Sequence, residues 1–274
     1  MEISEIIKDS FKFPANNIKA LAIYIVITFV IGLLIGGAAL SKIYFANNSM
    51  FAILSFIAFI VALLVGFILS GYQIDVIKTG ITFDELAPDF DLKNDFISGI
   101  KSVVVSIVCY IIPAVIALIV AFITNVPAHI LKFSEYISIT NTNGGVMLNN
   151  ATNPVPADVV SGLFGSLSIT LLISAIFFII FSFIAIMATA RLAKTDSLSE
   201  SLNILEAAKD ISRIGIGKVV ATVVAVFIII LVVNLIVSLI GQYIPLLSFI
   251  NIILTPYMVF ASNRATGLLY SHIA

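Results

Sequence analysis

The densest group of carboxylates in this chain lies between residues 84 and 95, and carboxylates are well suited to binding a hard cation. The group comprises Asp84, Glu85, Asp89, Asp91 and Asp95. Calcium-binding loops place their ligands at fixed positions around a glycine, and this segment lacks that pattern. A solvated turn, in which Thr82 and Glu85 form a cap, is therefore favoured over a metal site, and no cofactor is expected.

Enzymatic chemistry needs several reactive groups in one place. The histidines, His129 and His272, belong to connections that the topology derived below places on opposite sides of a membrane. The sequence of residues 215–218, Gly-Ile-Gly-Lys, lacks the glycine spacing and the following Ser or Thr of a phosphate-binding loop. These features together predict a protein that is not an enzyme.

Three polar side chains interrupt the apolar blocks near the end of the chain: Asn234, Gln242 and Asn251. They are the candidate intramembrane site, because they could line a path for a solute. Hydrogen bonding between helices is the more common use of such residues. Ionisable groups, which ion-coupled transporters usually keep at membrane depth, are absent from the middle of every apolar block.

The composition requires that most of the chain lies in lipid. Of its 274 residues, 61% are hydrophobic and 11% are charged, whereas soluble domains carry roughly 25% charged residues. The net charge of −1 gives no reason to expect nucleic acid as a partner. Blocks of about 20 apolar residues cross a bilayer as helices. Six blocks qualify: 20–40, 51–73, 102–123, 162–188, 219–240 and 245–262.

Basic residues cluster in alternate connections between these blocks. The N-terminus, the 74–101 and 189–218 connections and the C-terminal tail hold twelve of the 14 basic residues. Because Lys and Arg accumulate on the cytoplasmic side, both termini are predicted in the cytoplasm. The fold predicted is all-α: an integral protein of the cell membrane whose six transmembrane helices form three outward hairpins.

An amphipathic cytoplasmic helix is expected before each hairpin. These segments begin near Ile3, Asp89 and Leu198, and they suit the membrane interface. Ser197 and Glu200 form a capping box before the third segment. The chain is then a single membrane domain of three hairpin units. The units are 1–79, 80–195 with an outer insertion at 124–161, and 196–274.

Basic residues also mark the cytoplasmic ends of the spans. The residues where spans two, four and six end are Lys78, Arg191 and Arg264, and such side chains can extend to the lipid headgroups. Asp75 and Lys78 are expected to pair on one helix face. In the outer insertion, Pro127 suits the start of a short helix, and an irregular cap is expected after it.

Two prolines and one glycine pair bear on how the spans pack. Pro113 and Pro256 should kink spans three and six. The glycines of Gly32-x-x-x-Gly36 permit close helix contact, either within one chain or in a dimer.

The N-terminal half carries motifs of a known family. They are Ile-Lys-Asp-Ser-Phe-Lys-Phe-Pro at 7–14, Gly71-Tyr72, Lys78-Thr79-Gly80, Leu-Ala-Pro-Asp-Phe-Asp at 86–91 and Phe-Ile-Ser-Gly-Ile-Lys at 96–101. Together they resemble the multi-pass membrane family of archaea catalogued as domain of unknown function four-oh-one-three. The resemblance implies the membrane fold and implies no activity, because the family has none assigned.

The motifs and the end of span two supply a second candidate site, on the cytoplasmic face. Its residues are Asp9, Asp75, Lys78, Pro88, Asp89 and Asp91. Three functions remain open. The first is a non-enzymatic scaffold, assembly factor or accessory subunit, which would work with a membrane-protein partner or as a homo-oligomer in the lipid bilayer. The second is a permease or channel for a neutral or lipid-like solute, and the third is an enzyme acting on lipid.

Overall fold

A computed structural model describes residues 1–44, 48–142, 145–150, 155–244 and 249–274. The chain divides into two compact units, and each is described by itself. Unit 1 comprises Met1–Ile107 and Phe183–Ala274, and unit 2 comprises Val108–Ser182. This division does not follow the boundaries of the three expected hairpin units.

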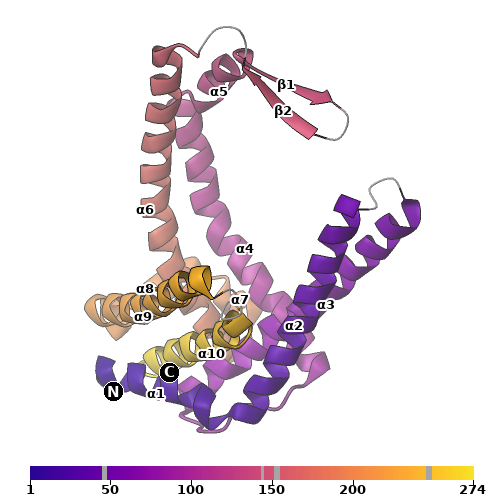
Figure 1. The fold of residues 1–274 in the computed structure, drawn as a ribbon. Helices are drawn as coiled ribbons and strands as arrows, with labels where there is room; N and C mark the ends of the chain where they lie inside the picture. The colour runs from indigo at the N-terminus through magenta and orange to yellow at the C-terminus, as the bar shows by residue number, and fades with distance from the viewer. Residues whose placement is uncertain (45–47, 143–144, 151–154, 245–248) are drawn as a thin grey trace. The chain divides into compact units, whose positions relative to one another are not determined.

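Both units are built almost entirely from helices (Figure 1). Unit 1 contains α1 (Ile3–Asn16), α2 (Ile18–Tyr44), α3 (Ser49–Thr82), α7 (Leu198–Ser201), α8 (Ile204–Ile214), α9 (Ile216–Tyr243) and α10 (Asn251–Tyr270). It also contains the start of α4 (Leu92–Ile123) and the end of α6 (Ala157–Thr195). The remainder of these two helices belongs to unit 2, with α5 (Val126–Glu135), β1 (Ile137–Thr142) and β2 (Gly145–Asn150).

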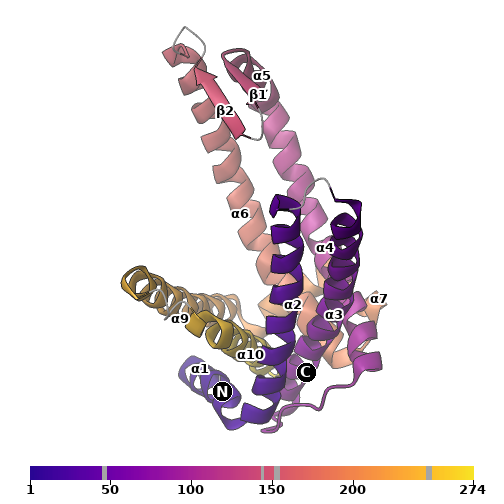
Figure 2. The ribbon, with the colours of Figure 1, turned by 45° about the vertical axis from the view of Figure 1, so that its right-hand side comes forward.

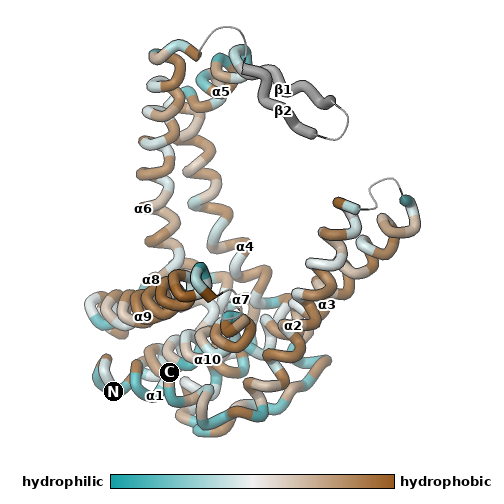
Figure 3. Tube along the Cα trace, in the orientation of Figure 1, coloured by the Kyte–Doolittle hydropathy of each residue, from teal (hydrophilic) through white to brown (hydrophobic). Residues whose placement is uncertain are grey.

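Five helices in the described part of the chain are long and apolar enough to cross a membrane. They are α2 up to Ser41, α3, α4, α6 and α9, and they contain the first five predicted spans. Figure 3 shows the hydrophobic residues that dominate these helices. The predicted sixth span does not qualify by the same measure. Its residues 245–248 lie outside the described residues, and α10 begins at Asn251 and carries Arg264 in its interior.

The amphipathic helices differ from expectation in two of three cases. α1 is a separate helix that buries Ile6, Ser10 and Phe13. The second expected helix is continuous with span three, because α4 runs unbroken from Leu92. The third is divided into α7 and α8, each with its own cap. Asn203 caps α8. At the start of α7 the backbone N–H of Glu200 donates to the Ser197 side chain (3.4 Å), which confirms one half of the predicted capping box, whereas the Ser197 N–H donates to Thr195 Oγ1 and not to Glu200.

Unit 2 contains a β-hairpin where an irregular cap was expected. β1 and β2 pair antiparallel, with Ile137 opposite Asn150 and Thr142 opposite Gly145. The β-branched Ile and Thr residues of β1 are enriched in strands. The predicted helix in the outer insertion is present as α5, with a proline in its first turn. α4 and α6 are joined in this unit by the stacked rings of Tyr110 and Phe178, whose centroids are 6.3 Å apart.

α10 is central to the packing of unit 1. It contacts α1, α2, α3 and α9, and Figures 1 and 2 both show α9 beside it. Its Phe260 ring lies edge-on to Tyr24 of α2, with ring centroids 5.3 Å apart. Tyr72 of α3 joins this cluster and stacks on Phe90 at 3.9 Å. These wholly or largely buried rings form the core between α2, α3 and α10.

Glycines allow α3 and α10 to approach backbone to backbone. A Cβ at Gly267 would lie 2.0 Å from the Ile77 carbonyl oxygen, and one at Gly80 would lie 2.7 Å from the Arg264 carbonyl oxygen. Gly32 and Gly36 behave differently, because a Cβ there meets no described atom within 4 Å. A tight helix contact is therefore made between α3 and α10, whereas the Gly-x-x-x-Gly motif makes none with the described residues.

Candidate functional site

The most buried basic side chain among the described residues of unit 1 is that of Arg264, which is 2% exposed. Its Nε donates to Asp9 Oδ1 of α1 (2.9 Å), and its Nη1 donates to the Asp84 carbonyl oxygen (2.6 Å). The guanidinium carbon lies 4.6 Å from the centre of the Phe13 ring, a distance suited to a cation–π interaction. Arg264 thus joins α10, α1 and the connection after α3. It does not extend to the headgroups as expected for an arginine at the end of a span.

A second cluster surrounds Asp210 of α8, which is 1% exposed. Its Oδ2 accepts from Arg191 Nη1 of α6 (2.7 Å) and from the Tyr270 hydroxyl of α10 (3.0 Å). Its Oδ1 accepts from Arg213 Nη1 (2.7 Å). One carboxylate therefore fixes α6, α8 and α10 to one another.

The pKa values of the groups around Asp210 are shifted in the directions that its negative charge requires. Burial, and then the Asp210 carboxylate, raise the pKa of Tyr270, because both disfavour a phenolate. Hydrogen bonds to Asp210 and Glu206 raise the pKa of Arg213. The pKa of Glu206 is lowered by Lys209 and Arg213. These are the directions expected where each charged group stabilises the charged form of its ion-pair partner.

The residues predicted to form a site on the cytoplasmic face all lie in unit 1, but they have different roles there. Asp9 belongs to the Arg264 cluster, whereas Asp75 and Lys78 line an open pocket of about 520 Å³. Ion pairs among the described residues do not include Asp75 with Lys78, contrary to expectation. Asp91 accepts from the backbone of Lys93 and so caps α4.

The last two residues of that set occupy the connection between α3 and α4. The Pro88 carbonyl oxygen accepts from the Tyr72 hydroxyl (3.1 Å), so its role is structural. The Asp89 side chain is exposed. Groups of three or more potential ligands that could hold a metal ion are absent from the described residues.

The predicted intramembrane polar residues are not brought together at a site. Asn234 is exposed and donates to the Ile230 carbonyl oxygen of its own helix (2.8 Å). Gln242 and Asn251 are also exposed, at the end of α9 and the start of α10. A solute path built from these three side chains therefore has no geometric support.

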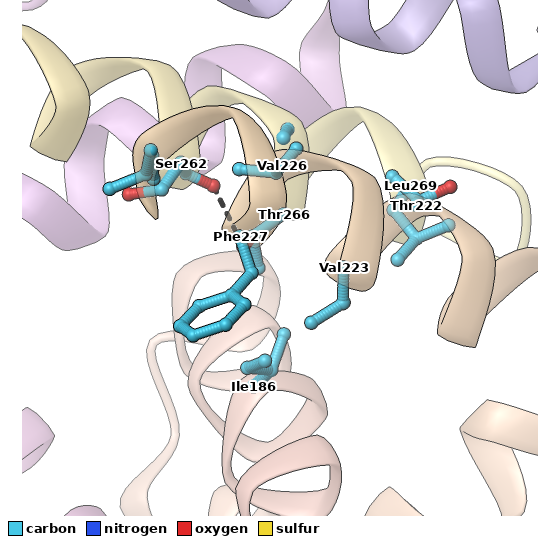
Figure 4. A pocket seen from close by; sticks show the side chains of 10 residues that line it. Ile186, Thr222, Val223, Val226, Phe227, Ser262, Thr266 and Leu269 are labelled. Atoms are coloured by element: carbon cyan, nitrogen blue, oxygen red, sulfur yellow. Dashed lines mark hydrogen bonds between the residues drawn. The ribbon is translucent and has the colours of Figure 1, made fainter. Parts of the chain in front are cut away.

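An apolar pocket of about 180 Å³ lies between α6, α9 and α10 (Figure 4). Its lining residues are Ile186, Thr222, Val223, Val226, Phe227, Ile230, Ser262, Ala265, Thr266 and Leu269. The hydroxyl of Thr266 donates to the Ser262 carbonyl oxygen (3.0 Å). Thr222 is 1% exposed, and its hydroxyl has no hydrogen-bond partner in the described chain. The lining is therefore mainly apolar, and the pocket suits an apolar group.

Comparison with known families decides where this chain belongs. Residues 53–242 match the family described as protein of unknown function DUF4013. The chain is a member of the DUF4013 family. An uncharacterized protein of Methanocaldococcus jannaschii is 34% identical over 74 residues, which cover 25% of this chain and 26% of that protein. The match thus spans about a quarter of the relative's length. No solved structure matches the chain.

In this DUF4013 protein, the sequence did not predict that three charged residues of unit 1 are buried. Arg264 was expected at a membrane surface and Asp95 in a solvated turn, and no role was predicted for Asp210. All three are buried. Only Arg264 carried a signal, because it interrupts the otherwise apolar pattern of α10, and ionisable residues in such positions are usually paired.

Proposed function

We propose that this protein is a non-enzymatic membrane scaffold, assembly factor or accessory subunit. The observation that supports it is the use of buried charge: Arg264 and Asp210 each connect three parts of unit 1 through hydrogen bonds. Groups engaged in this way stabilise a fixed shape and are not available as nucleophiles or bases. A part of the protein that the Arg264 and Asp210 clusters hold in a fixed shape is suited to presenting a surface to another membrane protein.

Reconstitution tests this proposal. The purified protein in liposomes should neither transport solutes nor convert lipid substrates. In the host, deletion of the gene should cause loss of a specific membrane complex that the wild-type gene restores. Turnover or transport by the protein alone would contradict the proposal. A set of membrane complexes unchanged by the deletion would also contradict it.

The exposed side chain of Leu86 offers a variant that separates docking from folding. Leu86 is 78% exposed on the connection after α3, so Leu86→Glu should leave the stability of the chain unchanged. We expect this variant to fold and yet fail to restore the complex. Asp89→Asn, on the same connection and also exposed, is the matched control for a polar substitution.

A permease or channel for a neutral or lipid-like solute is the second candidate, and the pocket in Figure 4 favours it. Thr222 lines the pocket, and a rotation of its buried, unpartnered hydroxyl would let it bind the polar atom of such a solute. Thr222→Val keeps the shape and removes the hydroxyl, so uptake into vesicles should fall. Asn234→Ala is the control, because Asn234 is exposed. Equal uptake by Thr222→Val and the wild type would exclude this path.

The orientation of the chain is part of the proposal. The Met1 amino group lies 3.3 Å from His272 Nε2, and Lys218 Nζ donates to the Met1 carbonyl oxygen (2.7 Å). Termini on one side of a membrane require an even number of crossings, which supports α10 as a sixth crossing beside the five apolar helices. The distribution of basic residues supports a cytoplasmic location for both termini.

Thiol labelling tests the orientation. The native thiol, Cys109, is buried, so a cysteine introduced at Ser271 should dominate the signal. A membrane-impermeant reagent should label Ser271→Cys in inverted vesicles and not in right-side-out vesicles. The opposite result would reverse the orientation.

A further inference from the structure

Two carboxyl groups converge where α3 and α4 meet in unit 1. A Cβ at Gly71 of α3 would lie 1.7 Å from the Asp95 carbonyl oxygen, so the helix backbones are in contact there. Asp75 follows Gly71 by four residues and therefore lies on the same face of α3, one turn along. The side chains of Asp75 and Asp95 are within hydrogen-bonding reach of each other.

The Asp95 carboxyl is enclosed, and one of its oxygens has no donor. Asp95 is 0% exposed. Its Oδ2 accepts from the Asp91 backbone N–H (3.0 Å), but its buried Oδ1 has no hydrogen-bond partner among the described residues. An unpaired buried carboxylate oxygen is costly. The side chain within hydrogen-bonding reach, that of Asp75, is another acid, which can donate only if one of the two carries a proton.

The surrounding charges do not supply a replacement for that proton. Lys78 on α3 is the basic group near the pair, and Asp91 and Asp196 add negative charge. Asp196 in turn pairs with Lys101 (2.7 Å). Two ionised carboxylates in this position would repel each other between helices that Gly71 holds in contact.

We infer that Asp75 and Asp95 form a proton-binding site in which one shared proton joins the two carboxyl groups. The proton gives Asp95 Oδ1 the partner that the described residues do not otherwise provide. Asp75 also lines the open pocket of about 520 Å³ that contains Lys78. This pocket connects the buried acid with solution, so that the site can exchange its proton. The inference is independent of whether the protein acts as a scaffold or as a permease.

Infrared spectroscopy of the purified wild-type protein is the first test. The C=O stretch of a protonated carboxyl group is separate from the bands of a carboxylate. At neutral pH we expect a carboxylic acid band that is lost on alkaline titration. A wild-type spectrum with every carboxyl ionised at neutral pH would overturn the inference, whatever the variants do.

Two conservative substitutions assign the band. In Asp95→Asn or Asp75→Asn, an amide N–H replaces the shared proton, so either substitution should abolish the band while the helical circular dichroism is retained. Exposed Asp89 provides the matched control, and Asp89→Asn should keep the band. A band that persists in Asp75→Asn would assign the proton to an isolated Asp95 and overturn the sharing. A band lost in Asp89→Asn would also overturn the assignment.

Discussion

Replacing Asp9 by alanine should destabilise the protein more than replacing its partner Arg264 by methionine. The two members of this ion pair differ in burial: the Arg264 side chain is 2% exposed, and that of Asp9 is 41% exposed. Without Asp9, a guanidinium that cannot lose its proton remains buried with no counter-charge. Without Arg264, the Asp9 carboxylate turns to water. The loss of stability therefore depends on which of the two charges remains without its partner.

Magnitudes can be assigned from the contacts. Removing one partner of a buried pair costs about 3–5 kcal/mol, and the exposure of Asp9 places Asp9→Ala near the lower limit. Arg264→Met leaves the Asp84 carbonyl oxygen without its donor, which costs about 1–3 kcal/mol. The methionine still packs on Phe13. At roughly 2–4 °C per kcal/mol, Asp9→Ala should lower Tm by about 10 °C and Arg264→Met by about half as much.

The double variant Asp9→Ala/Arg264→Met provides the sharpest measurement. Once Arg264 has been removed, the loss of Asp9 leaves no buried charge without a partner. The Tm of the double variant should therefore be close to that of Arg264→Met. Thermal unfolding in detergent checks this, with exposed Asp89→Ala as the control expected to change stability by less than about 0.5 kcal/mol. Additive losses in the double variant, or a higher Tm for Asp9→Ala than for Arg264→Met, would refute the reasoning.

Three further predictions follow from the packing and the charges. Gly267→Ala should lower Tm because its Cβ would lie 2.0 Å from an α3 carbonyl oxygen, whereas Gly36→Ala, with no described atom within 4 Å, should leave Tm unchanged; equal effects in detergent melts would contradict this. The pKa of Tyr270 is raised in the folded protein, so the contribution of this residue to the free energy of unfolding is complete below pH about 10 and is lost as the pH rises further. Tyr270→Phe should therefore lose less stability than the wild type at alkaline pH. An equal loss in both proteins would refute this prediction. Lys101→Met should cost less than about 1 kcal/mol, since its partner Asp196 is 77% exposed; a larger loss in a denaturant titration would show that the pair is more important than its exposure implies.

The apolar blocks could be located from sequence because lipid imposes a simple requirement. A helix in hydrocarbon must be long and apolar, and the five helices that meet this requirement contain five of the predicted spans. Boundaries were harder to predict. The connection before α4 was expected to contain a separate helix, but α4 begins at Leu92, directly after Asp91 has capped its first turn. Local capping decided that boundary.

The Arg264 cluster could not be predicted because its partners are distant in sequence. Arg264 bonds to Asp9 and to the carbonyl of Asp84, and no periodicity of α10 encodes either contact. The polar residues selected for their apolar surroundings, such as Asn234, are exposed in the structure. Apolar neighbours along the chain did not indicate burial, because in a membrane protein the lipid-facing surface is as apolar as the core.

The difference between sequence hydropathy and actual surroundings also explains α10. This helix is not apolar enough to qualify as a membrane span by its sequence, although unit 1 is built around it. A hydropathy average counts the full cost of Arg264, as if the side chain faced lipid. In the structure its guanidinium faces Asp9, the Asp84 carbonyl oxygen and the Phe13 ring. Twenty residues of helix at 1.5 Å each are about 30 Å long, comparable to the hydrocarbon thickness. Asp9→Ala thus tests more than one ion pair: if α10 depends on Asp9 to remain in the membrane, the impermeant thiol reagent should react differently with Ser271→Cys once Asp9 is removed.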